Sequence, residues 1–431
     1  MSFDEALAYL LSLGHETLTI KLGLRNTETL LDALGDPHKE FPSVQIAGTN
    51  GKGSTAVTLD SICRAAAIRT GLFTSPHLIS ITERIKINGT QISETDFAAL
   101  TAQVKTTSEE LVRLGRLEAL PTFFEQVTAI ALLAFRAARV ELAILETGLG
   151  GRLDSTTAAG ADIVAITPVA MDHEEYLGNT LAEIAAEKAA IIRPGVIAIV
   201  APQDEAALNI IVRQSERAGV APRFTTHTLP DSYEYISIGL RGRHQIANVS
   251  VAIALAEALR ERGFAITDAA IVGGVETATH PGRLELWEGR PGEGQPGYLF
   301  DGAHNPAAAR ALRDYLNEFI TQPITMIFAA MKDKALAEMA ATLFPKVNEL
   351  ILTELDNPRA ATVERLASIV PVSFDQSRVH LASSPNEALE LARSVTPPNG
   401  LVCVTGSLYL VGTVQEILRE SARIARERSG H

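Results

Sequence analysis

A lysine inside a glycine-rich turn is the feature of this sequence with the clearest chemical meaning. Residues 48–54 read GTNGKGS, with an apolar stretch before them (44–47) and an amphipathic stretch after them (55–64). Glycines let a backbone approach an anion, the N–H groups at a helix start point toward it, and Lys52 adds a mobile positive charge. This order of strand, turn and helix therefore favours a site for nucleotide phosphates.

The loop departs from the usual phosphate-loop pattern G-x-x-x-x-G-K-[ST]. Ile46 stands at the first glycine position, and Gly53 follows Lys52. The alternative is an ordinary glycine-rich turn. The flanking strand and helix favour the nucleotide site over that alternative.

Charged side chains follow two further stretches that are typical of buried strands. Glu146 follows the apolar stretch 140–145 and precedes a glycine-rich run, while His173 comes shortly after the apolar stretch 163–167. The carboxyl ends of parallel strands meet at one edge of a sheet, where ligands bind. We therefore interpret Glu146 as a candidate metal ligand near the phosphates. The alternatives are a plain carboxylate at a strand end and a structural histidine.

Lys188 is the third candidate, and it lies on a helix predicted over residues 180–193. Its neighbours Ala185, Ala186, Ala189 and Ala190 make that helix largely apolar. A lysine on a helix is normally solvated. Here the apolar neighbours favour a buried or partly buried amine.

The elements that must position these residues alternate between strands and helices. Apolar strands near residues 44, 70, 140, 163 and 196 predict an N-terminal doubly wound, mostly parallel α/β sheet that carries the phosphate-binding loop. Residues 280–297 are rich in Pro and Gly, as in a hinge. A smaller C-terminal α/β domain follows, with strands expected near 298–300, 324–330, 348–353 and 401–405. We place the domains at 1–281 and 282–431.

Composition restricts the class of protein. The chain has 431 residues, a formal net charge of -13 and 46% hydrophobic residues, and this acidic balance argues against nucleic acid as a partner. Cys63 and Cys403 lie in apolar runs and are typical of buried thiols in a reducing compartment. There is no secretory signal pattern and no apolar run of the ~20 residues that span a bilayer. We expect a cytoplasmic monomer that binds neither nucleic acid nor membrane.

Nine short stretches together resemble the folylpolyglutamate synthase/dihydrofolate synthase family of the Mur-type ligases. Each is weak or moderate alone, but their order and spacing are specific and they span nearly the whole chain. The family form of the nucleotide loop also has Gly after Lys, as Gly53 is here. The stretches are GTNGKGS (48–54), TSPHL (74–78), ERIKING (83–89), ETGLGGRLD (146–154), DHEEYLGNTLAEIAAEKA (172–189), GRHQIAN (242–248), PGR (281–283), DGAHNP (301–306) and TGSLYLVG (405–412).

The resemblance implies an ATP-dependent amide ligase. In such an enzyme ATP phosphorylates a carboxylate, the amino group of L-glutamate attacks the acyl phosphate, and ADP and phosphate leave. The implied cofactors are ATP and two Mg²⁺ ions, with K⁺ as an optional addition. The implied acceptors are dihydropteroate and reduced folates. A monofunctional folylpolyglutamate synthase is the alternative within the family.

The resemblance also implies a role for each matching residue. Glu146 and Ser75 would hold the first metal ion and His173 the second, and Lys188 would be carbamylated. A pterin ring would stack near residues 122–124. The implied sets are, for ATP, Thr49, Asn50, Gly51, Lys52, Gly53, Ser54, Asn248, Arg283 and Asp301; for metal, Ser75, Glu146, His173 and carbamylated Lys188; for catalysis, Lys52, His173, Lys188, Asp301 and His304; and for substrates, Thr122, Phe123, Phe124, Arg152 and Ser407.

Some positions depart from the family pattern. Residues 155–157 read Ser-Thr-Thr where Ala-Thr-Asn is usual, Glu174 stands where Thr is common, and Ala190 replaces a usual Gly. None of these changes removes a charged catalytic group. The loop of residues 15–26, with Lys21 and Arg25, is an expected second place for a pterin ring, with solvated loop charges as the alternative.

Two other activities were weighed. A cell-wall Mur ligase needs an extra N-terminal uridine-binding domain, and we expect the residues before Val44 to be too few for one. A non-catalytic nucleotide-binding switch would keep the Lys52 loop but would not need Glu146, His173 and Lys188 together. The sequence therefore favours the ligase.

Overall fold

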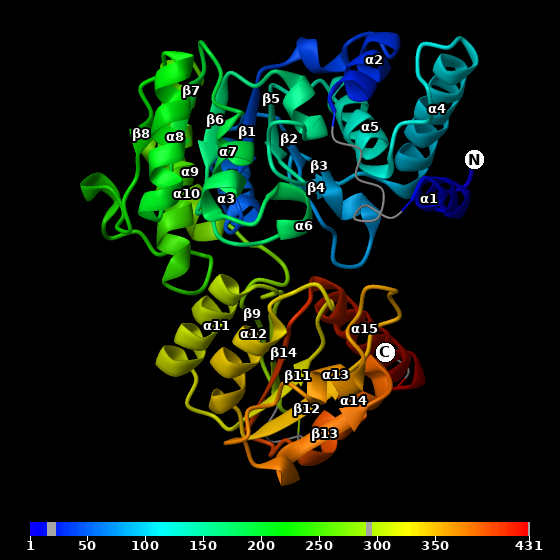
Figure 1. The fold of residues 1–431 in the computed structure, drawn as a ribbon, viewed down its shortest axis with the longest axis vertical. Coiled ribbons are helices and arrows are strands. Elements are labelled where there is room, and N and C mark those ends of the chain that lie inside the picture. The colour runs from blue at the N-terminus through cyan, green and yellow to red at the C-terminus, as the bar shows by residue number, and fades with distance from the viewer. Residues whose placement is uncertain (15–22, 290–294, 430–431) are drawn as a thin grey trace. The chain divides into compact units, whose positions relative to one another are not determined.

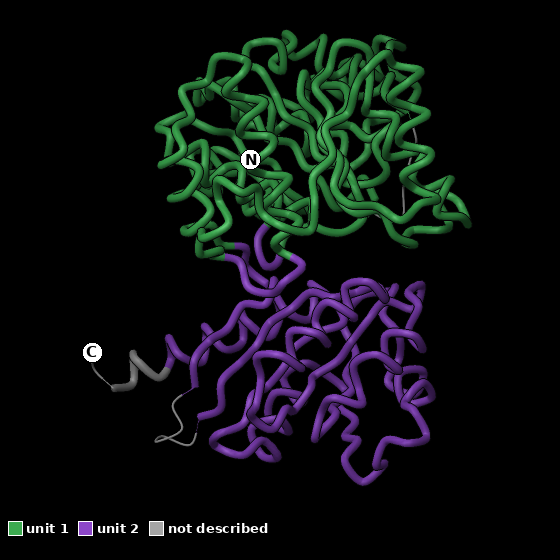
Figure 2. The backbone as a smooth tube through the Cα atoms, turned by 90° about the vertical axis from the view of Figure 1, so that its left-hand side faces the viewer, with its two compact units in different colours: residues 1–77, 81–239, 245–279 green, residues 78–80, 240–244, 280–431 purple. Residues whose placement is uncertain are grey.

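The structure, a computed structural model, describes residues 1–14, 23–289 and 295–429. The chain divides into two compact units (Figure 2). Unit 1 comprises Met1–His77, Ile81–Gly239 and Gln245–Thr279, and unit 2 comprises Leu78–Ser80, Leu240–His244 and His280–His431. Of the loop predicted as a second ring site, Lys21 lies outside the described residues, whereas Arg25 begins helix α2 (Arg25–Ala33).

Unit 1 is built on an eight-stranded sheet with the order β4-β3-β2-β5-β1-β6-β7-β8 (Figure 1). The pairs are parallel except for the two that involve β3, with β2 and with β4. Asn88 and Gly89 connect β3 and β4 with positive φ, as the predicted hairpin turn requires. The strands are β1 (Ser43–Ala47), β2 (Thr70–Phe73), β3 (Ile85–Ile87), β4 (Thr90–Gln91), β5 (Leu142–Glu146), β6 (Ile163–Ile166), β7 (Ile197–Val200) and β8 (Arg223–Phe224).

Helices cover both faces of this sheet, so the predicted doubly wound, mostly parallel fold is confirmed. Strand β5 shows why, because Leu142 and Ile144 pack into one core while Ala143 and Leu145 pack into the core on the opposite face. Alternation along a buried strand produces these two cores. The first core contains α3 (Lys52–Ala65), α9 (His244–Glu261) and α10 (Asp268–Thr277), and the opposite face contains α5 (Phe123–Ala137), α7 (Leu181–Ala189) and α8 (Glu205–Ala218).

Smaller helices complete unit 1. Helix α1 (Phe3–Ser12) and helix α4 (Glu94–Arg113) pack around α5, and α6 (Glu174–Leu177) precedes α7. The start of α5 is fixed by a capping box in which Thr122 accepts from the Glu125 N–H and the Glu125 carboxylate accepts from the Thr122 N–H. The same device begins α7 at Thr180. Helix α7 ends at Ala189, earlier than the sequence predicts.

Unit 2 is built on a six-stranded sheet with the order β13-β12-β11-β14-β10-β9, which is parallel except for β9. Helices α11 (Pro306–Phe319), α12 (Leu336–Leu343) and α13 (Val363–Ala367) lie on one face, and α14 (Pro385–Val395) and α15 (Leu408–Ser429) on the other. The predicted second α/β domain is therefore confirmed as a fold. The strands are β9 (Glu285–Trp287), β10 (Gly297–Asp301), β11 (Ile324–Phe328), β12 (Glu349–Thr353), β13 (Val379–Ala382) and β14 (Leu401–Thr405).

The sequence did not predict β9 and β13, and both are edge strands. Only Ala382 of β13 is buried, so this strand lacks the apolar run that marks a central parallel strand. No helix in the described part of the chain is long and apolar enough to cross a membrane.

Candidate active site

The loop between β1 and α3 is shaped by two glycines that other residues cannot replace. Gly48 and Gly51 have φ values of 146° and 87°, which L side chains rarely adopt. A Cβ on Gly48 would collide with the Thr167 side chain, and one on Gly51 would collide with the side-chain amide of Asn248. Asn248, which the resemblance assigned to ATP, thus lies against the predicted phosphate loop.

The loop backbone is fastened to the segment that follows β6. The N–H groups of Thr49 and Asn50 both donate to the Pro168 carbonyl oxygen at 3.1 Å. The Thr49 hydroxyl donates to the Ala170 carbonyl and accepts from its N–H, each at 3.0 Å. These contacts fix the loop just before the first turn of α3, which begins at Lys52 and has the positive end of its dipole there.

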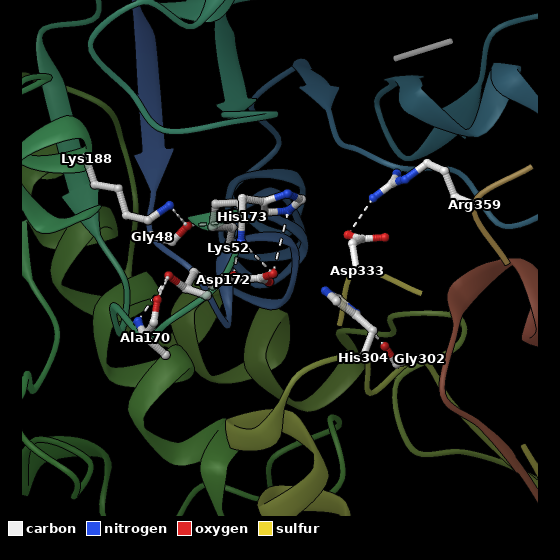
Figure 3. A network of polar contacts seen from close by, with 11 residues as sticks. Gly48, Lys52, Ala170, Asp172, His173, Lys188, Gly302, His304, Asp333 and Arg359 are labelled. Carbon is white, nitrogen blue, oxygen red and sulfur yellow. Dashed lines mark hydrogen bonds and ion pairs between the residues drawn. The ribbon is translucent and has the colours of Figure 1, made fainter. Parts of the chain in front are cut away.

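Two lysines from distant helices converge on one carbonyl oxygen of this loop (Figure 3). Lys52 Nζ lies 3.2 Å from the Gly48 carbonyl oxygen, and Lys188 Nζ lies 2.9 Å from it. Lys52 also donates to the Thr49 carbonyl oxygen. Lys188 is only 4% exposed. Burial, with the nearby charge of Lys52, lowers the pKa of Lys188 to about 7. A substantial fraction of Lys188 is therefore a neutral amine near neutral pH.

Asp172 and His173 follow β6 at the same carboxyl edge of the sheet (Figure 3). The His173 N–H donates to Asp172 Oδ1 at 2.9 Å, and the ring Nε2 lies 4.0 Å from the same oxygen. His173 adopts the left-handed conformation, with a φ of 52°, where α6 begins. Asp172 is 9% exposed and favours the charged form of Lys188, opposing Lys52. The sequence predicted His173 but assigned no role to Asp172.

Ser75 and Glu146 are brought together from two neighbouring strands. The Ser75 N–H, just after β2, donates at 3.1 Å to Glu146 Oε2 at the end of β5. Glu146 is 5% exposed. A hydroxyl and a carboxylate are oxygen ligands of the kind that Mg²⁺ prefers, and Mg²⁺ usually completes its shell with water and phosphate oxygens. The donor set fits such an ion.

Ser75 and Glu146 would supply only some of the ligands of such an ion. Within residues 1–14, 23–289 and 295–429, no group of three or more His, Cys, Asp and Glu side chains is placed to hold a metal. The neutral Lys188 amine is not an oxygen ligand. Carbamylation would supply one, because it turns the amine into a carboxylate.

The glycine-rich loop after β5 is held by a buried carboxylate that the sequence did not single out. Asp154 Oδ2 accepts from the Gly148 and Leu149 N–H groups, both at 2.9 Å, and Oδ1 accepts from the Thr156 N–H at 3.0 Å. Burial raises the pKa of Asp154, and these hydrogen bonds oppose the rise. Its signal in the sequence was its place as the cap of a short helical turn, residues 155–159.

The Ser-Thr-Thr departure from the family pattern has a structural role in this loop. Gln45 of β1 donates to the hydroxyls of Thr156 and Thr157 at 3.0 and 2.7 Å. Thr157 in turn donates to the Gly151 carbonyl at 2.7 Å. Thr156 matches the family pattern, so Thr157 is the departing residue whose hydroxyl ties the loop beside Glu146 to the central strand.

The predicted substrate residues divide into one packed group and one more accessible group. Phe123 is 4% exposed and belongs to the core, with the Arg84 guanidinium 5.4 Å from its ring centre. Stacking of a pterin ring near residues 122–124 stays a prediction. Phe124 is partly buried against Phe73, with ring centres 5.8 Å apart. Arg152 lies near the surface and pairs with Glu187 at 2.8 Å.

Unit 2 has its own cluster of predicted residues at the carboxyl end of β10. The buried Asp301 carboxylate accepts from the N–H groups of Leu284 and Ala303 at 2.9 and 3.0 Å. Burial raises its pKa, and the charge of Arg283 opposes that rise. The Gly302 carbonyl accepts from Arg283 Nη1 at 3.2 Å, and His304 Nδ1 lies 2.8 Å from the same oxygen.

Ser407 follows the neighbouring strand β14. It is 3% exposed, and its hydroxyl accepts from the Tyr409 N–H at 3.2 Å in the first turn of α15. Asp301 and Thr405 are direct partners across β10 and β14. The structure therefore places Asp301, His304 and Ser407 in or near neighbouring loops at one edge of the sheet, an adjacency that the sequence did not predict.

Comparison with known proteins gives two family matches that together span most of the chain. Residues 46–256 match the Mur ligase middle domain, and residues 282–408 match the Mur ligase, glutamate ligase domain. Dihydrofolate synthase/folylpolyglutamate synthase of Bacillus subtilis (strain 168) is 34% identical over 433 residues, covering 94% of this chain and 97% of that protein.

Solved structures agree with this match. Mycobacterium tuberculosis folylpolyglutamate synthase complexed with ADP has a TM-score of 0.87 and 30% identity, covering 96% of this chain and 99% of that one. A bifunctional folylpolyglutamate synthase/dihydrofolate synthase with Mn, AMPPNP and L-glutamate bound has a TM-score of 0.84 and 29% identity, covering 97% and 98%.

Proposed function

The chain belongs to the Mur ligase family, in its folylpolyglutamate synthase/dihydrofolate synthase branch, and on this premise we propose that it joins L-glutamate to dihydropteroate and to reduced folates. Membership of the family makes it an ATP-dependent ligase. The names of the relatives support these acceptors. The observation that carries the phosphoryl-transfer chemistry is the convergence of Lys52 and Lys188 on the Gly48 carbonyl, in a strand–loop–helix phosphate site.

The proposed chemistry proceeds through an acyl phosphate. Transfer of the γ-phosphoryl group from ATP to a carboxylate brings two anions together, so catalysis depends on positive charge and on positioning. Lys52 supplies a charge at the outer phosphates, and the first turn of α3 with Gly53 and Ser54 supplies backbone N–H groups. Thr49, Asn50, Gly51 and Asn248 shape the loop around the nucleotide. The glutamate amine then displaces phosphate and forms the amide.

Divalent metal belongs to the proposal through the oxygen ligands already described. Ser75 and Glu146 would hold a first ion, and His173 a second. When bound, Mg²⁺ neutralises charge on the phosphate oxygens during transfer. The relative with Mn and AMPPNP bound supports a divalent cofactor and ATP here. Potassium is an optional addition to the proposal.

Carbamylation of Lys188 explains an otherwise unfavourable arrangement. Two ammonium groups that share the Gly48 oxygen repel each other, and Lys188 is nearly fully buried. A carbamate on Lys188 replaces this repulsion by attraction to Lys52 and provides a metal-binding carboxylate. We propose that this modified form is the active one.

Substrate contacts follow from position in each unit. In unit 1, Phe124 is the proposed stacking surface for the pterin, with Thr122 at the start of the same helix and Arg152 as a further proposed contact. In unit 2, Arg283, Asp301, His304 and Ser407 are the proposed contacts for nucleotide and glutamate. The relative that carries bound L-glutamate supports this choice of amino acid.

Two alternatives make different predictions. A dedicated folylpolyglutamate synthase would use tetrahydrofolate but not dihydropteroate. A nucleotide-binding switch would hydrolyse or bind ATP without requiring an acceptor. Incorporation of labelled glutamate should be measured with purified enzyme and each acceptor in turn. We expect incorporation with both acceptors, and incorporation with neither would overturn the proposed substrates.

We propose that the enzyme is a monomer in the cytoplasm and that it acts on small molecules. Cys63 and Cys403 are buried free thiols, and burial raises the pKa of both. Such thiols suit a reducing compartment. Sedimentation of the purified enzyme would test the oligomeric state.

A further inference from the structure

The side chain of Gln203 continues the pairing of β6 and β7 beyond the point where the two strands separate. At the end of the pair, the Ala201 N–H donates to the Ile166 carbonyl oxygen at 2.9 Å. Farther along, Gln203 Oε1 accepts from the Val169 N–H at 3.0 Å, and Gln203 Nε2 donates to the Thr167 carbonyl oxygen at 3.1 Å. A primary amide carries the same kinds of donor and acceptor as a peptide group. Gln203 therefore takes the place of one more peptide group of β7.

The two backbone partners fix the orientation of the Gln203 amide. An N–H group can only donate and a carbonyl oxygen can only accept, so Oε1 must face Val169 and Nε2 must face Thr167. Pro168, which lies between these partners, has no N–H of its own. An apolar side chain of similar length would satisfy neither partner. Gln203 is only partly buried, so its replacement removes hydrogen bonds without opening a cavity in the core.

The segment that this amide holds is also the segment against which the phosphate loop lies. The N–H groups of Thr49 and Asn50 both donate to the Pro168 carbonyl oxygen at 3.1 Å. One residue earlier, Gly48 approaches the Thr167 side chain so closely that a Cβ would collide with it. The loop thus contacts residues 167–168 at positions 48, 49 and 50.

Hydrogen bonds on both sides of Pro168 set the direction of its carbonyl. Peptide groups are planar, so a carbonyl oxygen can turn only when the neighbouring peptides turn as well. The Gln203 amide holds the Thr167 carbonyl on one side of Pro168 and the Val169 N–H on the other. A loop that binds an anion through backbone N–H groups binds more tightly when it is already ordered, because less conformational entropy is lost on binding.

We propose that Gln203 is a positioning residue for ATP, which holds the Pro168 carbonyl and thereby orders the phosphate loop before the nucleotide binds. The proposal rests on the proposed function of residues 48–54 as the phosphate site. Gln203 acts through Pro168 and the N–H groups of Thr49 and Asn50, and not through contact with the substrate. All of these residues belong to unit 1.

The test is a Gln203→Met variant of the full chain, which keeps the approximate length of the side chain and removes both hydrogen bonds. We expect the Kd for ATP, measured by calorimetry with Mg²⁺, to rise about tenfold, roughly the effect of one lost hydrogen bond. The KM for ATP should rise by a similar factor, while the KM for glutamate stays at the wild-type value. Hydrogen exchange of the Thr49 and Asn50 amides should become faster, and exchange in the strands of the sheet should not change.

The matched control is Gln214→Met in helix α8 of the same unit. Gln214 is also partly buried, and its amide donates to the Ile192 carbonyl oxygen at 3.0 Å. This control should bind ATP with wild-type affinity, and the exchange of the loop amides should not change.

Three results would overturn the positioning role. The first is wild-type ATP affinity in a folded Gln203→Met enzyme, and the second is faster exchange that spreads through the whole of unit 1. The third is a failure of both Gln203→Met and Gln203→Ala to fold, since Gln203 would then be a structural residue. Wild-type ATP affinity in Lys52→Ala would instead count against the phosphate site itself, so the two failures can be distinguished.

Discussion

Carbamylation of Lys188 is the prediction that depends most directly on the geometry of the site. In the experiment, ¹³C-labelled bicarbonate is added to the purified enzyme at a series of pH values, and the concentration of dissolved CO₂ is held constant. A carbamate forms only from the neutral amine. Its formation therefore depends on the pKa of Lys188, which burial and the charge of Lys52 lower to about 7.

The magnitude follows from that pKa. At pH 7.5, roughly three-quarters of a lysine with a pKa of about 7 is neutral, against about one part in a thousand for a lysine with the ordinary pKa of 10.5. The neutral fraction falls as the pH drops below 7, because the amine then binds a proton. Carbamate occupancy should therefore rise through pH 7 and be strongly reduced at pH 5.5.

The assay is the ¹³C NMR signal of the carbamate carbon. We expect one protein carbamate in the wild-type enzyme with nucleotide and metal, and none in Lys188→Met, which keeps the length of the side chain without the amine. Lys346→Met, at an exposed position, is the control and should retain the signal. A wild-type enzyme that is active at pH 8 without a carbamate signal would refute the reasoning, and so would a signal that persists in Lys188→Met.

Three further predictions concern the phosphate loop, the metal and the acceptor. Lys52→Ala should reduce ligase activity by ~10²-fold or more, the scale of losing one charge-stabilising donor. The control, Lys346→Ala, should keep wild-type turnover. A folded Lys52→Ala enzyme with normal turnover would contradict the assignment of Lys52 to the phosphates. Glu146→Gln should raise the Mg²⁺ concentration for half-maximal activity, measured by titration, and an unchanged Mg²⁺ dependence would argue against Glu146 as a ligand. Phe124→Leu should raise the KM for the pterin acceptor but not for glutamate, whereas Phe319→Leu at an exposed position should change neither; equal KM values for wild type and Phe124→Leu would exclude stacking there.

The phosphate loop was predictable because its signal is local. The glycines that surround Lys52 and the flanking strand and helix are all within one continuous stretch of the sequence. The structure adds that Gly51 must lack a side chain because Asn248 approaches it from α9, about two hundred residues later in the chain. A contact of that kind leaves no trace in local periodicity.

The doubly wound sheets were predictable for a similar reason, since central parallel strands are continuous apolar runs. Helix α10 was not, because Gly273 and Gly274 lie in its interior and glycine disfavours helices. The structure supplies the reason for Gly274: a Cβ there would collide with the backbone of Ile62 in α3. Close packing of the two helices thus overrides propensity.

The sequence could not show which side of an element a residue of the site faces. Phe123 and Phe124 are adjacent in the sequence, yet Phe123 belongs to the core and Phe124 is only partly buried. Asp154 was overlooked because its importance lies in the backbone N–H groups that it accepts, not in its neighbours' side chains. Such pairings follow from tertiary structure and not from residue type.

The central claim is that this ligase activates its acceptor by phosphorylating the carboxylate beside Lys52. The most direct measurement uses dihydropteroate labelled with ¹⁸O in its carboxyl group, together with ATP, L-glutamate and the purified enzyme, followed by mass analysis of the released phosphate. The account predicts that each amide formed is accompanied by ADP and by one phosphate that contains a single ¹⁸O atom. Phosphate without ¹⁸O, or label found in AMP, would contradict it.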